Sequence, residues 1–300
     1  MRRGLFIYNP VSGSQMVPGM LDDILAYGLD KGLSLIPFRL NLSQENRELL
    51  PQLLQASWVD FVIASGGDGT LGMIAQAILA CRPDLPMGII PAGTCNDLAE
   101  SMQLPQDVWD CINVVAENDC VSLDAGRVNG ERIFLSTCAA GMFINVSYSI
   151  SNLLKKRLGP LAYYFSALGE LSRIRSFPLR IETESEVIED HFLLFLLING
   201  TQAAGLPNLY SKARMMDGFM DLLLIRDVPP IDLPYLLIEL MNRDNEENGR
   251  WFKRLRARYF QFDSTQAIQT TQDGDEGLPL PLRVEVLPQA LTVYARKENA

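Results

Sequence analysis

The stretch with the clearest chemical meaning is Gly66-Gly67-Asp68-Gly69-Thr70, which sets an aspartate among three glycines. It follows the apolar run of residues 58–65 and precedes a helical pattern over residues 71–81. A strand, a glycine-rich turn and a helix together expose backbone N–H groups that suit phosphate. Phosphate would repel the Asp68 carboxylate unless a cation lay between them, and Mg²⁺ prefers oxygen ligands. The motif therefore predicts a phosphate site that uses Mg²⁺.

Two nucleotide-binding patterns are absent from this motif. No Lys-Ser/Thr follows it, as in a P-loop, and the G-x-G-x-x-G spacing of dinucleotide sites is not met. The alternative is a tight turn that only joins two elements. Two further polar loops, NPVSG (9–13) and PAGTCNDLA (91–99), follow other apolar runs, and SLDAG (122–126) supplies Asp124. The ends of parallel strands share one edge of a sheet, where ligands usually bind.

The elements that position these loops alternate between strand and helix. Such alternation, with continuously apolar strands, is typical of a parallel sheet covered on both faces. Pro37 puts the second strand near a sheet edge or an irregularity, and Ser43 is a candidate N-cap. The expected strands span 4–10, 33–40, 58–65 and 86–93, and the expected helices span 17–31, 43–56 and 71–81.

Beyond residue 122 the pattern changes to many short strand-like runs separated by turn residues. This favours a mainly antiparallel β domain, with helices expected only at 150–175 and 231–257. The fold class is therefore an α/β domain with a parallel sheet followed by a mainly antiparallel β domain.

The bulk composition narrows the function. The chain has 300 residues, 48% of them hydrophobic, and a net charge of −10, which argues against duplex nucleic acid as a partner. The N-terminus has no signal-peptide pattern, and no apolar run is long enough for a transmembrane segment. Five cysteines in an irregular pattern are typical of reduced thiols, so we expect a cytoplasmic protein. The sole histidine, His191, lies in an apolar run and is interpreted as structural, which disfavours a Ser-His-Asp hydrolase.

A basic and aromatic stretch, RWFKRLRARYF (250–260), has two interpretations. One is a helix with a solvated charged face, and the other is contact with a membrane surface. The segment LLKKRLGPLAYYF (153–165) is a rival contact site.

The order NPxSG, GGDGT, PxGTxNDxA resembles the diacylglycerol-kinase catalytic domain family, above all the soluble bacterial lipid kinases of the YegS/DgkB type. The likeness extends over residues 124–147, 211–225 and the QDGDEG region with its closing strands. It implies a nucleotide-binding α/β domain (1–122, plus a terminal strand at about 289–300) and a β-sandwich lipid-substrate domain (123–288). It also implies an ATP- and Mg²⁺-dependent enzyme that meets its lipid peripherally at the membrane; a homodimer stays one alternative.

The resemblance assigns roles to individual residues. Asp273 would be the general base on the lipid hydroxyl, with Asp275 beside it. The acidic network around catalytic Mg²⁺ would be Asp68, Asp97 and Asp124. A second, structural Mg²⁺ would bind at Asp217 and near Arg214 and Phe219 through their carbonyls. The ATP site would be lined by Asn9, Pro10, Ser12, Gly13, Asn41, Gly66, Gly67, Asp68, Gly69, Thr70, Leu71, Gly72, Thr94 and Asn96.

The chain departs from the family pattern at three positions. Asn41 stands where threonine is common, Glu100 where arginine is common, and Asp275 in place of the glutamate of D-G-E, with Glu276 next to it. The pairs Asp273-Gly274 and Asp217-Gly218 are also ordinary turn signals. Two rival functions remain: a NAD kinase-like enzyme, and a catalytically inactive regulator that binds nucleotide or lipid.

Overall fold

The protein was analysed as a computed structural model. The structure describes residues 1–13, 15–41, 44–141, 176–205, 213–229, 232, 235–236, 239–240 and 248–296.

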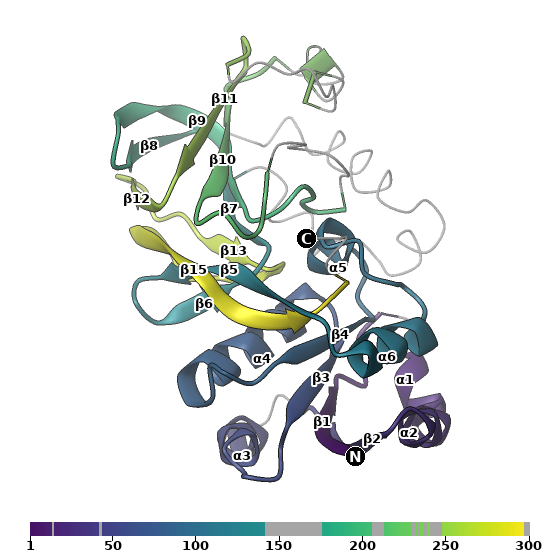
Figure 1. Ribbon diagram of the computed structural model, residues 1–300. Helices are drawn as coiled ribbons and strands as arrows, with labels where there is room; N and C mark the ends of the chain where they lie inside the picture. The colour runs from purple at the N-terminus through teal and green to yellow at the C-terminus, as the bar shows by residue number, and fades with distance from the viewer. Residues whose placement is uncertain are drawn as a thin grey trace.

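A parallel sheet forms the core of the N-terminal part, in the lower half of Figure 1. Its strands are β1 (Arg2–Tyr8), β2 (Leu33–Arg39), β3 (Phe61–Gly66) and β4 (Met87–Pro91). They run in the order β2-β1-β3-β4, with all neighbours parallel. Every residue of β3 and β4 is buried, because helices cover both faces of the sheet.

Six helices connect and cover these strands. They are α1 (Met16–Gly19), α2 (Leu21–Asp30), α3 (Gln44–Leu54), α4 (Asp68–Cys81), α5 (Asp97–Ser101) and α6 (Val108–Glu117). One apolar core joins α3 and α4 to the sheet, and a second joins α2 and α6 to its other face. The sheet is therefore the middle layer of three, and α3 and α4 lie on one side while α2 and α6 lie on the other (Figure 1).

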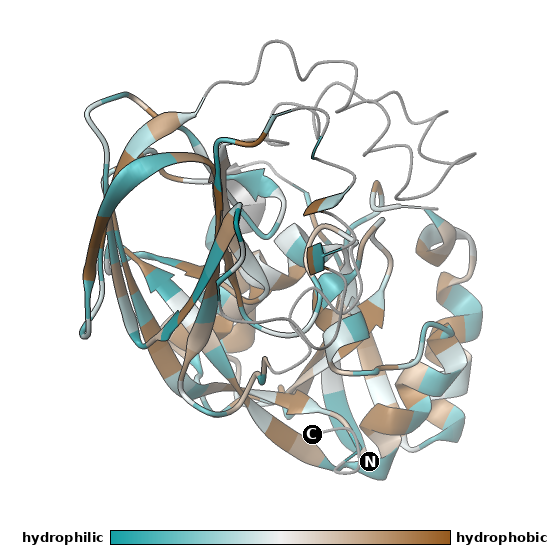
Figure 2. Ribbon diagram, turned by 90° about the horizontal axis from the view of Figure 1, so that it is seen from above, coloured by the Kyte–Doolittle hydropathy of each residue, from teal (hydrophilic) through white to brown (hydrophobic). Residues whose placement is uncertain are grey.

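The second part of the chain is mainly antiparallel, as the pairing of its strands shows. Along these strands the ribbon in Figure 2 is banded in brown and teal, the pattern of strands with one buried face. The strands are β5 (Cys120–Val128), β6 (Arg132–Phe134), β7 (Thr137–Gly141), β8 (Phe177–Glu182), β9 (Val187–Ile198), β10 (Met220–Arg226), β11 (Phe252–Ala257), β12 (Tyr259–Asp263), β13 (Thr270–Gln272), β14 (Asp275–Glu276) and β15 (Leu282–Tyr294).

The long strand β15 links the two parts. It pairs with β5 along both of its halves. Its first half also pairs with β12, and its far end joins β4, with Val293 opposite Met87 in parallel register. A register shift between Leu287 and Leu291 interrupts its pairing with β5. One continuous sheet therefore runs through the molecule from β2 to β14.

The predicted fold class is confirmed: a parallel α/β part is followed by a mainly antiparallel β part. Pro37 lies in the edge strand β2, as predicted. The exact domain boundaries stay a proposal. Ser43, the helix expected at 150–175 and the segment 153–165 lie outside the described residues.

The helical interpretation of residues 250–260 is wrong, as is the C-terminal part of the helix expected over 231–257. This stretch forms strands β11 and β12. β11 pairs with β10, which buries Phe252, Arg254 and Ala257. The many basic residues suggested a helix with a solvated charged face, but pairing with distant strands determines the structure.

Among the described helices, none is long and apolar enough to cross a membrane.

Candidate active site

Three loops meet at the carboxyl edge of the parallel sheet. The Asn9 side chain, after β1, donates from Nδ2 to Thr70 Oγ1 on α4 at 3.0 Å. After β4, the Ala92 N–H donates to Gly66 O at 2.9 Å, and the Gly93 N–H donates to Asn96 Oδ1 at 2.7 Å. The polar loops that sequence reasoning singled out are therefore side by side, as their positions after parallel strands predicted.

Asp68 is the first residue of α4, and its carboxylate faces the start of α5. It accepts hydrogen bonds from the N–H groups of Asp97 at 3.2 Å and Leu98 at 3.0 Å. Burial raises the pKa of Asp68 above its ordinary value of 3.8, although these N–H groups act in the opposite direction. The N-terminus of α5 thus holds the carboxylate by backbone contacts alone.

Asp97 extends this chain of contacts into the second part of the protein. Its carboxylate accepts from the N–H groups of Ala204 at 2.8 Å and Gly205 at 2.9 Å, in the loop after β9. Burial, and next the charge of Asp68, raise the pKa of Asp97 to about 6. A cation between the two carboxylates would offset the repulsion by which the charge of Asp68 raises the pKa of Asp97.

The two acids therefore fit a Mg²⁺ ion held through water. Each carboxylate oxygen has a second lone pair after its N–H contact, and Mg²⁺ commonly keeps several waters in protein sites. Among the described residues, no three His, Cys, Asp or Glu side chains lie close enough together to hold a metal ion directly.

Asp124, the third predicted member of the network, makes different contacts. It is fully buried on β5, and its carboxylate accepts from the N–H groups of Gly218 at 2.6 Å and Gln289 at 2.7 Å. Its own N–H donates to Met215 O at 2.7 Å. Asp124 therefore ties the loop before β10 and the irregular part of β15 to the strand that begins the second part.

The segment that the resemblance assigns to a structural metal lies in this loop. Arg214 is exposed, and Asp217 and Phe219 are half-buried. The Asp217 carboxylate accepts from the Phe219 N–H at 3.1 Å and forms an ion pair with Arg256.

Asp273 lies at the tip of a hairpin and is almost fully buried. Asp273 and Gly274 both have positive φ, and they join β13 to β14 as a two-residue turn, the ordinary meaning of an Asp-Gly pair. The Asp273 carboxylate accepts from the N–H groups of Leu135, Ser136 and Thr137 at 2.8, 2.8 and 3.0 Å. Burial raises the pKa of Asp273 to about 7 in spite of these three contacts.

The hairpin packs against the glycines of α4. A Cβ atom at position 72 would lie 2.5 Å from Asp273 Oδ2, and one at position 69 would lie 2.2 Å from Asp275 Oδ2. The i, i+3 spacing puts both positions on one face of the helix. Gly69 and Gly72 therefore leave room for two carboxylates, and not only for a phosphate chain.

Asp275, and not Glu276, faces α4. The two residues are consecutive in β14, so their side chains point to opposite faces of the hairpin. Although Asp275 is exposed as a residue, burial of its carboxylate raises its pKa, opposed by the charge of Arg132. The shorter acid thus occupies the position that the resemblance gives to glutamate.

A cleft of about 530 Å³ runs along α4 beside this hairpin. Its polar end holds Asp273, Asp275 and Arg132, and its apolar walls come from the end of β2 and from α3 and α4. The apolar lining includes Leu40, Leu50, Pro51 and Met73.

The remaining predicted nucleotide residues are placed as follows. Asn41, Gly13 and Thr94 are exposed, Pro10 and Ser12 are half-buried, and Gly66 and Gly67 form the turn into α4. The Leu71 side chain is buried in the core, and its N–H donates to Gly67 O within the helix turn, so it offers little to a ligand.

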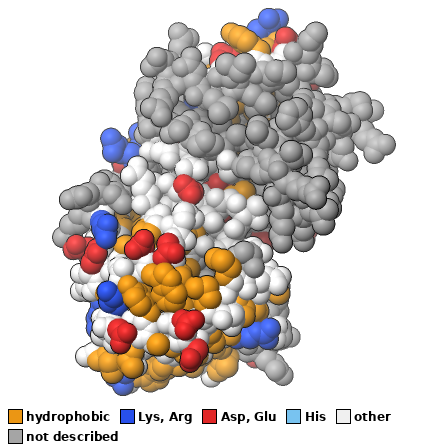
Figure 3. All heavy atoms as spheres, turned by 90° about the vertical axis from the view of Figure 1, so that its right-hand side faces the viewer, with side chains coloured by type: hydrophobic (Ala, Val, Ile, Leu, Met, Phe, Trp, Pro, Cys, Tyr) orange, Lys and Arg blue, Asp and Glu red, His pale blue; other side chains and the backbone are white. Residues whose placement is uncertain are grey.

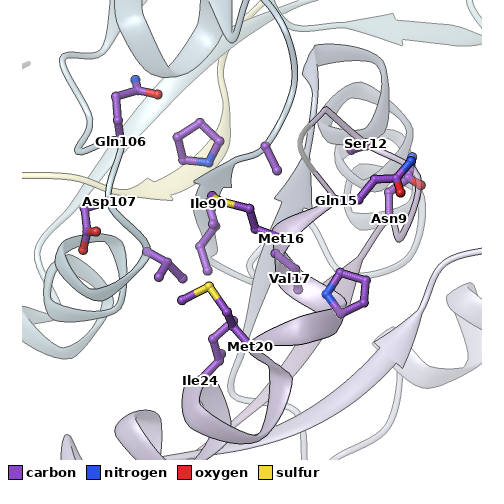
Figure 4. A pocket seen from close by; sticks show the side chains of 14 residues that line it. Asn9, Ser12, Gln15, Met16, Val17, Met20, Ile24, Ile90, Gln106 and Asp107 are labelled. Carbon is purple, nitrogen blue, oxygen red and sulfur yellow. The ribbon is translucent and has the colours of Figure 1, made fainter.

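A second hollow of about 170 Å³ lies between α1, α2, α6 and the loops after β1 and β4, and the predicted nucleotide residues Asn9 and Ser12 line it. Figure 4 shows Met16, Met20 and Ile90 turned toward one another, with Gln106 and Asp107 on the far side. Figure 3 shows hydrophobic side chains gathered on this side of the molecule, with acidic side chains beside them. The hollow lacks the grouped carboxylates of the cleft, so the cleft is the candidate active site.

Two residues at the site were missed by sequence reasoning. Buried Asn199 donates from Nδ2 to Asp124 O and to Leu135 O, both at 2.8 Å, and so aligns β5 with the segment that holds Asp273. Its place at the end of a long apolar run was an available signal. Arg132 donates to Glu276 O at 3.0 Å and supports the hairpin; no sequence pattern marked it. His191 is exposed on β9.

In this fold the polar loops of the α/β part meet at one edge of its parallel sheet, and the β part adds the carboxylates of Asp273 and Asp275 beside them. Residues 3–128 match the family described as Diacylglycerol kinase catalytic domain, and residues 137–295 match the family described as YegS C-terminal NAD kinase beta sandwich-like domain. The chain belongs to the diacylglycerol kinase family.

Similar proteins support this assignment over the whole length. The chain is 30% identical to a diacylglycerol kinase of Staphylococcus saprophyticus, covering 98% of this chain and 95% of the relative. It is 29% identical to a diacylglycerol kinase of Staphylococcus carnosus, covering 99% and 96%.

Solved structures show the same fold. A diacylglycerol kinase crystal structure from Bacillus anthracis str. Sterne has a TM-score of 0.76 at 20% identity and covers 100% of this chain and 98% of that one. Another structure from this strain has a TM-score of 0.81 at 23% identity, covering 100% and 97%.

Proposed function

We propose that the protein is an ATP- and Mg²⁺-dependent lipid kinase. It transfers the γ-phosphoryl group of ATP to a lipid hydroxyl, most simply that of diacylglycerol, to give phosphatidic acid. The observation that carries this proposal is the buried Asp273 carboxylate, which the β13–β14 hairpin brings against Gly72 of α4, beside the phosphate-type loops. Family membership supports the reaction class.

The polar loops at the sheet edge bind the phosphates of ATP, and the cleft along α4 binds its base and sugar. Phosphates bind at the N-terminus of α4, where free N–H groups and the helix dipole favour negative charge. The apolar walls of the cleft suit a flat base, and Asp275 offers acceptor oxygens to hydroxyl groups. ATP is thereby held with its phosphates next to Asp273.

Asp273 acts as the proton acceptor. The lipid oxygen forms a bond to the γ-phosphorus, the bond from that phosphorus to the bridging oxygen breaks, and ADP leaves. The hydroxyl proton passes to the Asp273 carboxylate. A pKa of about 7 suits this role, because a base works best when its pKa lies near the working pH.

Asp68 and Asp97 are the residues that would hold Mg²⁺ through water, since they form the pair of mutually repelling buried carboxylates. Bound there, the ion supplies positive charge that offsets the negative charge of the phosphates. Asp68, at the helix terminus, also orients α5 through its two N–H contacts.

The acceptor lies in a membrane, so the protein has to work at a membrane surface. We propose a cytoplasmic protein that binds the bilayer peripherally and transiently.

The test is phosphate transfer from γ-labelled ATP into a mixed lipid extract, with purified diacylglycerol and NAD as separate acceptors. The expected result is labelled phosphatidic acid, formed only with Mg²⁺ and lost in Asp273→Asn. The matched control is Glu276→Gln, which changes an acid of the same hairpin on the opposite face.

The same experiment separates the rivals. Label on NAD and none on lipid would support a NAD kinase-like enzyme, a class to which the description of the second domain points. Nucleotide binding without transfer to any acceptor would support an inactive regulator, for which Asp275 in place of glutamate is the main argument. Either result would refute the proposal.

A further inference from the structure

The loop before β10 carries the Asp217 carboxylate, whose two oxygens are both engaged. Oδ1 accepts from the Phe219 N–H at 3.1 Å, and Oδ2 is paired with the Arg256 guanidinium of β11. A structural Mg²⁺ at this loop would need that carboxylate as its charged ligand. In this chain a protein cation already lies against it.

The pairing of β10 with β11 puts Arg256 there. The antiparallel register sets Arg256 directly opposite Asp221, a buried residue of β10. Opposite residues of an antiparallel pair project from the same face of the sheet. The register between β10 and β11 therefore fixes the position from which the Arg256 side chain reaches the Asp217 loop.

Phe219 helps to hold the guanidinium, and a second arginine adds positive charge. The Arg256 guanidinium carbon lies 5.0 Å from the centroid of the Phe219 ring, and that of Arg258 lies 4.5 Å from it. Both distances are within the range of cation–π attraction. A divalent cation at Asp217 would face two guanidinium groups, whose like charges disfavour its binding. The residues present therefore do not fit a metal ion at this loop.

We propose that Arg256 is a built-in cation that takes the place of a structural metal ion at the Asp217 loop. An arginine is suited to this role because it is always charged and donates in a fixed planar geometry. The loop is then held from two sides, by Arg256 of β11 and by Asp124 of β5, which accepts from the Gly218 N–H.

The loop that Arg256 and Asp124 hold connects the two apolar cores. Met215, before the Asp217 turn, packs in the core of α3, α4 and the parallel sheet, whereas Met220, after it, packs in the core of the β domain. Arg256 is thus a positioning residue for the junction between the two parts, and its role is independent of the phosphate transfer reaction.

The test measures thermal unfolding in EDTA and in Mg²⁺ at matched ionic strength, without nucleotide, for the wild type, Arg256→Met and Arg283→Met. Arg283 is the matched control, since it also pairs with a carboxylate, Glu285 Oε1 at 3.3 Å, and lies 5.2 Å from an aromatic ring, that of Tyr259. The wild type and Arg283→Met are expected to shift by the same amount between the two buffers, within about 1 °C, because Mg²⁺ at Asp68 and Asp97 acts equally on both.

Arg256→Met frees the Asp217 carboxylate and is expected to behave differently. In EDTA its midpoint falls by roughly 2–4 °C relative to the wild type, and Mg²⁺ restores at least about half of that loss. A response to Mg²⁺ in the wild type that Asp217→Asn abolishes would overturn the proposal. So would an Arg256→Met protein that folds and gains no response.

A second measurement covers the case in which Arg256→Met does not fold. Mn²⁺ binding, followed by electron paramagnetic resonance without nucleotide, is compared between the wild type and Asp217→Asn. Equal binding supports the built-in cation. Loss of one bound ion in Asp217→Asn would show that the loop holds a metal and would overturn it.

Discussion

Replacing Gly72 by alanine should damage the site through a single methyl group. The added Cβ would lie 2.5 Å from Asp273 Oδ2, far inside van der Waals contact. The Asp273 side chain cannot swing away freely, because the N–H groups of Leu135, Ser136 and Thr137 hold it. Relief therefore requires the carboxylate to retreat by roughly 1 Å.

Two opposing terms set the effect on stability. A retreat of that size stretches the 2.8 Å contact between Asp273 Oδ2 and Leu135 N beyond hydrogen-bonding distance. Loss of one hydrogen bond to a charged group costs about 1.5–3 kcal/mol, whereas glycine to alanine inside a helix gains roughly 0.5–1 kcal/mol. The net destabilisation is about 1–2 kcal/mol.

The effect on turnover is larger. A catalytic group displaced by about 1 Å commonly costs on the order of a hundredfold in rate. Gly72→Ala should therefore lower kcat by about two orders of magnitude while leaving the protein folded.

The assay combines steady-state phosphate transfer with urea unfolding. Gly19→Ala is the control, because Gly19 also lies in a helix and an added Cβ there meets nothing within 4 Å. Its kcat should match the wild type. A Gly72→Ala protein whose kcat stays within about threefold of the wild type would refute the role given to Asp273 and its packing against α4.

Four further predictions concern the hairpin. Asp273→Asn should lower kcat by roughly 10²–10⁴-fold, because the proton acceptor is lost, while ATP binding, measured by calorimetry, is largely kept. The amide nitrogen of asparagine cannot accept the backbone N–H bonds that both carboxylate oxygens accept, so folding of the variant is verified by urea unfolding. The wild-type kcat/KM should rise with pH until the base form of Asp273 predominates above about pH 7, and a flat profile would contradict this. Burial raises the pKa of Asp273 from 3.8 to about 7, so between about pH 4 and 7 the folded state binds more protons than the unfolded state. The contribution of Asp273 to the free energy of unfolding therefore falls as pH rises through this range. Urea titrations should show a shallower fall in Asp273→Asn than in the wild type. Asp275→Asn should weaken turnover more than about tenfold and Glu276→Gln by less than about twofold, because only Asp275 faces α4, and the reverse order would show that the longer acid serves the site.

Much of the parallel half could be predicted because its signals are local. The strands β1, β3 and β4 are short apolar runs that end in polar turns, and burial on both faces requires that pattern. The same loops carry the residues that meet at the sheet edge. Helix α6 was not predicted, although Asp107 caps it and its apolar residues recur at helical spacing.

The rest depends on contacts between distant parts of the chain. Residues 250–260 became strands because β10 and β15 offer partners, which no local pattern reveals. The glycines of α4 could be interpreted as room for phosphate, but their contact with Asp273 and Asp275 exists only once β13 and β14 have packed against the helix. The metal-binding role that the resemblance gives to Asp124 stays a prediction, and no local pattern revealed that its carboxylate accepts from the N–H groups of Gly218 and Gln289.

The most direct test of the account is the fate of the γ-phosphate of ATP. The purified protein is incubated with labelled ATP, Mg²⁺ and diacylglycerol vesicles, beside Asp273→Asn. The account predicts labelled phosphatidic acid from the wild type and little or none from the variant. Equal labelling by both proteins, or no labelled lipid from a wild type that binds ATP, would contradict it.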